Sequence, residues 1–172
     1  MEGHEMKMTC ENCGFEAEYT DLDTSGHCPW EVLEPILKNV DIVLYDLKHL
    51  DSAEHKRMTG VGNELILSNL KKISENGQAI WVRIPVIPDY NDQLDYHLRV
   101  VDFLKSLPKP VERVDLLPFH NWCQDKYRWL GKDWVYTGME AMEPSFLNPF
   151  LDIYRDAGIQ ATIGGSGFEG RE

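Results

Sequence analysis

The chain has little positive charge, few cysteines and no long apolar run, and each shortage removes a class of protein. Its 17 basic residues stand against 29 acidic ones, and the net charge of −12 disfavours a nucleic acid or an anionic membrane as partner. Four cysteines in 172 residues are too few for a disulfide scaffold. No stretch approaches the roughly 18 apolar residues of a membrane span, and no signal peptide is recognisable. We therefore expect a cytoplasmic protein without a membrane partner.

Strand and helix patterns alternate along the chain, which predicts a single α/β domain over residues 1–172. The length falls short of the roughly 250 residues of a complete eight-unit β/α barrel. We expect at least four parallel strands with helices between them. Strands are predicted at 19–22, 41–46, 79–87, 111–117 and 159–163, and helices at 5–14, 29–39, 51–60, 63–77, from 91 or 92 to about 104, and 144–157.

Several positions have predicted local roles. Asp51 and Glu54 form a capping-box-like pair, and Asn63 is placed to cap the next helix. The segment 119–142 is rich in Trp, Tyr and Gly and is too long for a simple connector, which indicates a lid or a binding loop. Five of the histidines fall mostly on predicted helices or turns and are expected at the surface, namely His4, His27, His49, His55 and His97.

Polar clusters stand where four apolar strand-like runs end. Their reactive residues fall at 23, 46, 83 and 120, so the steps are 23, 37 and 37 residues, each about one strand–helix unit. In parallel α/β folds the carboxyl ends of the strands open onto one face, which carries the chemistry. The clusters are Asp23-Thr24-Ser25-Gly26, Asp46-Leu47-Lys48, Arg83 to Pro88, and Pro118-Phe119-His120.

Each cluster also has a simpler structural interpretation. Asp23 to Gly26 suits a hard cation or a ligand ammonium, or a plain helix cap. Asp46 and Lys48 lie on one side of a strand and form either an ion pair or a site for a ligand carboxylate. Arg83, inside an apolar strand, is either buried against Asp46 or recognises an anion. A lone histidine such as His120 is more often structural than catalytic.

Cys10-x-x-Cys13 invites a zinc or redox interpretation, but it lies on a predicted helix and no second pair has a suitable spacing. Cys28 and Cys123 are isolated in the sequence. We therefore expect that these cysteines bind no metal.

Taken together, the motifs resemble those of one family, the glycyl-radical-enzyme activating enzymes of the pyruvate formate-lyase type. Their joint order and spacing carries the resemblance, which runs from about residue 5 to the C-terminus. The motifs are Asp23-Thr24-Ser25-Gly26, Tyr45-Asp46-Leu47-Lys48, Thr59-Gly60-Val61 with Asn63, Arg83-Ile84-Pro85-Val86-Ile87-Pro88 with Asn91-Asp92, and Leu116-Leu117-Pro118-Phe119-His120 with Lys126-Tyr127 and Leu130-Gly131.

The resemblance implies a fold, a cofactor and a partner. Members are radical S-adenosylmethionine enzymes on a partial (β/α)6 barrel, in which a 4Fe–4S cluster cleaves the cofactor and a glycine of a partner enzyme loses a hydrogen. By resemblance, Asp46, Lys48, Arg83 and His120 contact the cofactor. A monovalent cation is implied at Asp23, Thr24 and Asp46 with the Leu44 carbonyl.

The departures from the family matter as well. The CxxxCxxC cluster motif is absent, so we expect this chain to hold no 4Fe–4S cluster and no catalytic residue of its own. Asp89 replaces a usual glycine. We expect an incomplete parallel barrel, about the last four strand–helix units, with the cluster-binding N-terminal part missing and an open sheet edge in its place. The alternative is a non-catalytic module that binds a partner or a nucleoside.

Overall fold

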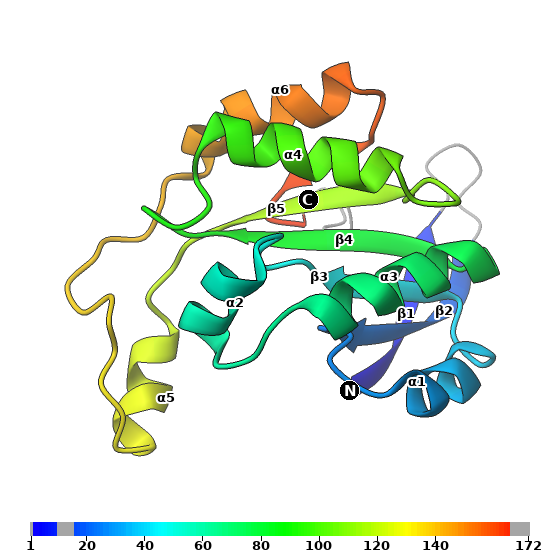
Figure 1. Cartoon of the computed structure of the whole chain (residues 1–172), viewed down its shortest axis with the longest axis horizontal. Helices are drawn as coiled ribbons and strands as arrows, with labels where there is room; N and C mark the ends of the chain where they lie inside the picture. Colours follow the sequence, from blue (N-terminus) through cyan, green and yellow to red (C-terminus); the bar gives the residue numbers. More distant parts are fainter. Residues whose placement is uncertain (1, 10–15, 166–172) are drawn as a thin grey trace.

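One sheet organises the chain, and the structure, a computed structural model, describes residues 2–9 and 16–165. The six strands lie side by side in sequence order (Figure 1). The last five run parallel to their neighbours, whereas the first pairs antiparallel with the second. The predicted parallel α/β fold is thereby confirmed. The strands are β1 (Glu2–Thr9), β2 (Glu16–Thr24), β3 (Ile42–Asp46), β4 (Ala79–Val86), β5 (Arg113–Pro118) and β6 (Ala161–Ile163).

Helices fill the connections between the parallel strands. The Asp51 side chain accepts a hydrogen bond of 2.9 Å from the Glu54 amide, as the predicted cap requires. None of the helices in the described part of the chain is both long and apolar enough to cross a membrane. The helices are α1 (Trp30–Leu37), α2 (Ser52–Thr59), α3 (Glu64–Asn76), α4 (Leu94–Lys105), α5 (Cys123–Trp129) and α6 (Asn148–Asp156), with a 3-10 turn η1 (Pro144–Leu147) before α6.

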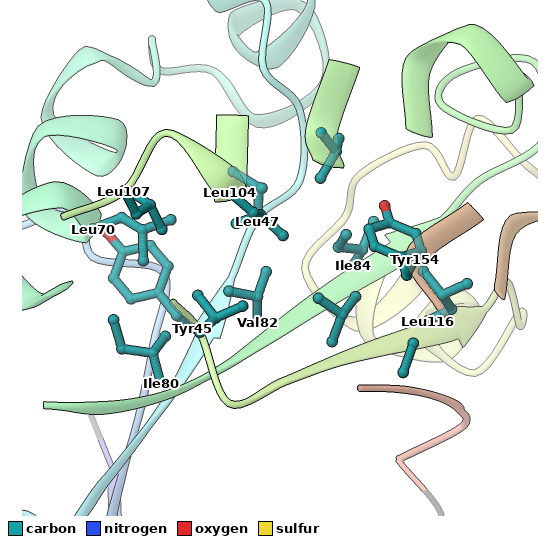
Figure 2. Packing of buried hydrophobic residues seen from close by; sticks show 14 of the residues in the cluster. Tyr45, Leu47, Leu70, Ile80, Val82, Ile84, Leu104, Leu107, Leu116 and Tyr154 are labelled. Carbon is teal, nitrogen blue, oxygen red and sulfur yellow. The ribbon is translucent and has the colours of Figure 1, made fainter. Parts of the chain in front are cut away.

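Alternate residues of the strands build the hydrophobic core against the helices. On β4, Ile80, Val82 and Ile84 are at most 1% exposed, because successive side chains of a strand point to opposite faces. Figure 2 shows Ile80 and Val82 on the side of Leu70 of α3 and Leu104 of α4, and Ile84 near Leu116 of β5 and Tyr154 of α6. The residues between them on β4, which include Arg83, therefore point away from this core.

The start of the chain differs from the prediction. A helix was expected over 5–14, but residues 2–9 form β1, which pairs with β2 from Glu2 opposite Asp23 to Thr9 opposite Glu16. The free backbone groups of the β2 edge give this segment hydrogen bonds that a local helix signal does not reveal. The expected open edge beside β2 is thus covered by β1. Cys10 and Cys13 lie outside the described residues.

Three histidines expected at the surface are buried. His49 is 5%, His55 3% and His97 0% exposed. The ring of His49 stacks on Tyr96 with centroids 4.8 Å apart, and the Nδ1 of His97 lies 2.8 Å from the Tyr154 hydroxyl. For His49 and His97 the prediction was wrong because these aromatic partners lie far away in sequence. His55 is instead held locally, with its Nδ1 2.7 Å from the Val61 carbonyl oxygen.

Burial of His97 predicts a loss of stability in acid. Desolvation lowers its pKa to about 4 from the ordinary 6.5, although a hydrogen bond with the Asn91 backbone opposes the shift. The unfolded chain binds this proton below pH 6.5 and the folded chain only near pH 4, so stability falls between these values by about 3 kcal/mol. Urea unfolding at several pH values measures the slope. His97→Gln should flatten it, and an unchanged slope in that variant would contradict the assignment.

Asp89 has a backbone conformation that glycine adopts most readily, which agrees with the expectation that a glycine is usual at this position. Its φ is 60°, which makes it the one non-glycine residue with a positive φ among the described residues. A side chain at such a φ carries strain that glycine lacks. Asp89→Gly should therefore stabilise the fold by about 0.5–1 kcal/mol in denaturant unfolding, while Asp89→Ala should destabilise it. A loss of stability in the glycine variant would show that the aspartate side chain has a structural role.

Candidate functional site

The parallel register brings the charged strand-end residues together on the face opposite the core. Asp46 of β3 lies opposite Arg83 of β4, and Arg83 lies opposite Asp115 of β5. Asp23 of β2 is opposite Leu44, two residues before Asp46. Because neighbouring residues in register share a face, the sheet presents Asp23, Asp46 and Arg83 as one group. Asp115 lies on the same face but pairs with Arg113.

Arg83 joins two carboxylates from the neighbouring strands. Its Nε donates to Asp46 Oδ1 at 2.9 Å, and its Nη1 donates to Asp23 Oδ2 at 2.8 Å. Its Nη2 contacts the second oxygen of Asp23 and lies 2.7 Å from Asp46 Oδ1. Burial opposes the charged guanidinium, but the hydrogen bonds and charges of Asp23 and Asp46 outweigh it and raise the pKa of Arg83. The guanidinium is a fixed bridge between β2 and β3.

Lys48 completes the group but is held more loosely. Its ammonium lies 3.8 Å from Asp46 Oδ2, and its side chain is 38% exposed, against 20% for Arg83. Two carboxylates and two cations leave the group without net charge. Lys48 is therefore the member whose hydrogen-bond donors remain available to an incoming anion such as a ligand carboxylate.

Part of the cation site implied by the resemblance is already engaged. Arg83 contacts both oxygens of Asp23 and one of Asp46, and the Thr24 hydroxyl accepts a 2.9 Å hydrogen bond from the Gly26 amide. No three His, Cys, Asp or Glu side chains of the described residues are grouped as a metal site. Arg83 therefore takes the place next to these carboxylates, and nothing among the described residues supports the cation predicted at Asp23, Thr24, Asp46 and Leu44, which remains an untested prediction.

His120 stands beyond the carboxyl end of β5 and is exposed. Its ring lies 4.2 Å from that of Trp122, and its Nδ1 accepts from the Trp122 amide at 3.4 Å. Among the contacts of the described residues, none joins His120 to Asp46, Lys48 or Arg83. The structure therefore places His120 at the predicted edge of the sheet without bringing it into the charged group.

The described cysteines do not form a cluster site. Cys28 and Cys123 are free thiols, the first half-buried and the second exposed, and burial raises the pKa of Cys28. A 4Fe–4S cluster needs about four ligands, usually thiolates. The described residues do not fit such a cluster.

Three buried asparagines that the sequence did not single out as site residues hold the loops at the strand ends. Each donates its side-chain amide to two backbone carbonyls, which is a demanding geometry that fixes both loop segments. Asn63 donates to His49 and Leu50, Asn69 to Gly26 and Cys28, and Asn91 to Lys48 and Pro85. Asn63 thus caps no helix with its side chain, contrary to expectation.

Removing one of these asparagines should weaken the site's framework. Asn91 is fully buried, donates to Pro85 at 2.8 Å and accepts from the Ile87 amide at 2.7 Å. Asn91→Ala leaves these backbone groups unpaired and should destabilise the fold by about 2–4 kcal/mol. Urea unfolding measures the change. Exposed Asn39→Ala should stay within about 0.5 kcal/mol, and an equal loss in both variants would contradict the role of Asn91.

Comparison with curated proteins returns activating enzymes. The chain is 31% identical over 164 residues to the 4-hydroxyphenylacetate decarboxylase activating enzyme of Clostridioides difficile strain CD196, with 94% of this chain and 50% of that protein covered. It is 38% identical over 130 residues to the choline trimethylamine-lyase activating enzyme of Oleidesulfovibrio alaskensis, covering 74% and 42%. The chain spans about half the length of the curated relatives it matches.

Solved structures agree with these relatives. A crystallised domain of a pyruvate-formate lyase-activating enzyme from Bacteroides vulgatus superposes with a TM-score of 0.68 at 31% identity, covering 84% of this chain and 80% of that one. A radical SAM methyltransferase from Sphaerobacter thermophilus, at 16% identity and a TM-score of 0.60, shares the fold. No family model matches the chain.

Proposed function

Because the chain belongs to the family of glycyl-radical-enzyme activating enzymes, we propose that it forms the S-adenosylmethionine-binding strand ends of such an activase. The partner is a glycyl radical enzyme, proposed to be of the pyruvate formate-lyase type. The chain is proposed to be the portion of a larger activase that follows the cluster-binding part, and to be inactive by itself.

One observation carries the proposal. The Asp23–Arg83–Asp46 bridge sits at the carboxyl ends of adjacent parallel strands, where α/β folds bind their ligands, with the partly exposed Lys48 beside it. The donor set suits a zwitterionic ligand, since Lys48 can bind a carboxylate while Asp46 accepts from an ammonium or a hydroxyl.

The residues of this chain bind and orient in the proposed function. Arg83 binds Oδ1 of Asp46 and holds this side chain in place, so that Oδ2 of Asp46 faces Lys48. The ammonium of Lys48 binds the carboxylate of the methionine part. His120, exposed beyond β5, is proposed to contact the cofactor from the far side. S-adenosylmethionine, when bound, supplies the group that takes a hydrogen atom from a glycine of the partner.

A competition experiment tests this function against the alternative of a nucleoside-binding module. Radiolabelled S-adenosylmethionine is equilibrated with the full chain, and S-adenosylhomocysteine or adenosine is added as competitor. Recognition through Lys48 predicts that S-adenosylhomocysteine, which keeps the amino-acid carboxylate, competes at least about tenfold better than adenosine. Equal competition by adenosine would favour the nucleoside-binding module, and no binding of S-adenosylmethionine would refute the proposed function.

A further inference from the structure

The most exposed large apolar side chains of the described residues gather in one segment. Trp122 and Trp129 are each 83% exposed, Val135 78% and Leu130 60%, whereas the next most exposed, on α4, reach 53%. Tryptophan is costly to leave in water and is enriched where proteins bind one another. Exposed apolar groups clustered in this way mark an interaction surface rather than scattered surface residues.

The two tryptophans lie on one face of a short helix. Trp122 directly precedes the first residue of α5, and Trp129 is its last residue. Seven residues make about two helical turns, so the two side chains lie on the same side of the helix, roughly 10 Å apart. Lys126 lies between them, four residues after Trp122 and three before Trp129. This i, i+4, i+7 arrangement is the pattern by which a helix enters a groove of its partner.

The opposite side of α5 anchors it to its own loop. The Tyr127 ring lies 4.7 Å from Trp134, and the Trp134 Nε1 donates to Asn121 Oδ1 at 2.7 Å. No residue of α5 is buried, and in Figure 1 the helix stands away from the sheet. A seven-residue helix is not stable alone, so this aromatic anchor holds the tryptophan face toward solvent.

The face adjoins the proposed cofactor site. The Trp122 ring contacts that of His120 in a tilted arrangement with centroids 4.2 Å apart, and His120 follows β5 at the carboxyl edge of the sheet. A molecule bound on the tryptophan face would therefore lie on the side of the sheet where the parallel strands end (Figure 1).

The charge of this segment differs from that of the chain. Residues 119–135 contain three basic residues, Lys126, Arg128 and Lys132, and two acidic ones, Asp125 and Asp133, so their net charge is +1 within a chain of −12. Arg128 pairs with Asp125 at 2.8 Å. The described contacts give Lys126 no ion pair, and it sits between the two tryptophans.

We propose that the outer face of α5 docks into an apolar groove with an acidic rim on the enzyme that is activated. The proposal rests on the proposed function, and the curated relatives are named for acting on another enzyme. Trp122 and Trp129 fill the groove, and Lys126 faces a carboxylate between them. Docking there holds the partner beside His120 while the strand ends stay free for the cofactor.

Binding to two purified glycyl radical enzymes tests the proposal. Choline trimethylamine-lyase of Oleidesulfovibrio alaskensis and 4-hydroxyphenylacetate decarboxylase of Clostridioides difficile are immobilised, and the full chain is passed over them by surface plasmon resonance. We expect binding to at least one enzyme, weakened at least about tenfold by Trp122→Ala with Trp129→Ala. Lys126→Glu should weaken it further as like charges meet. Leu94→Ala with Leu98→Ala, an exposed pair on α4, is the matched control and should change nothing.

Other outcomes decide against docking by α5. The proposal is overturned if the wild type binds neither enzyme, if the tryptophan variant binds as tightly as the wild type, or if the tryptophans instead drive self-association in sedimentation velocity. Circular dichroism of each variant verifies the fold. Lys48→Ala should weaken S-adenosylmethionine binding but leave docking unchanged. A wild-type chain that docks but does not bind S-adenosylmethionine refutes the proposed function alone, and a wild-type chain that binds S-adenosylmethionine but does not dock refutes docking alone.

Discussion

Gly26→Ala should destabilise the fold by about 3–5 kcal/mol, because two separate effects add at this position. Gly26 has a φ of 69°, where any other residue carries strain of about 1–2 kcal/mol. A Cβ there would also lie 1.7 Å from the hydroxyl oxygen of Tyr45, a fully buried side chain that donates a 2.7 Å hydrogen bond to the Ile66 carbonyl. The tyrosine has to move, and the loop that follows Asp23 moves with it.

Gly138→Ala isolates the backbone part of this effect. Gly138 has a φ of 78°, but a Cβ there would meet nothing within 4 Å. The loss of stability in Gly138→Ala should therefore stay near the backbone strain of about 1–2 kcal/mol. Urea unfolding compares the two variants. Similar losses at both glycines would mean that Tyr45 does not restrict Gly26, and the close packing behind the Asp23 loop would then be wrong.

Lys48→Ala should weaken S-adenosylmethionine binding by about tenfold or more. The ammonium of Lys48 lies 3.8 Å from Asp46 and is partly exposed, so it can turn to a ligand carboxylate without breaking a close ion pair. A charge-assisted contact contributes about 1–3 kcal/mol, and each 1.4 kcal/mol is tenfold in affinity. Without cluster ligands among the described residues, this contact makes up a large share of the binding. Isothermal calorimetry measures the affinities.

The control for this variant has to be a lysine without a partner of its own. Lys72, on α3, places its ammonium 5.1 Å from the Trp30 ring, so removing it changes packing as well as charge. Lys105→Ala, at the exposed end of α4, removes the same charge far from the strand ends. It should bind S-adenosylmethionine like the wild type. Equal affinities for the Lys48 and wild-type chains would remove Lys48 from the site.

The sequence allowed the sheet and its charged edge to be predicted because both follow from local patterns. Apolar runs bounded by glycine and proline predicted the parallel strands, and their spacing placed Asp23, Asp46 and Arg83 at strand ends. The register then brings these residues into contact, which the structure shows. The Asp51 cap was predictable for the same reason, since both of its partners lie within one turn of helix.

The features that were not predicted depend on partners that are distant in sequence. β1 forms because the edge of β2 offers hydrogen bonds, and the sequence of residues 2–9 alone does not reveal that edge. His97 is buried by Tyr154, 57 residues away. Asn69 holds carbonyls 41 and 43 residues earlier in the chain. In each case a polar group or short segment is placed by its tertiary partners rather than by its neighbours in the chain.

Amide chemical shifts recorded during a titration with S-adenosylmethionine test the central claim most directly, since they show where the ligand binds. We predict shift changes in the last residues of β2 and β4 and in the loop after β3, around Asp23, Arg83 and Lys48, and after β5 at His120. No change is expected in the pocket at the opposite end of the sheet, lined by Leu107, Pro110, Val111 and Ile159. Changes confined to that pocket, or changes at only one of the strand ends, would contradict a site built jointly by the strands.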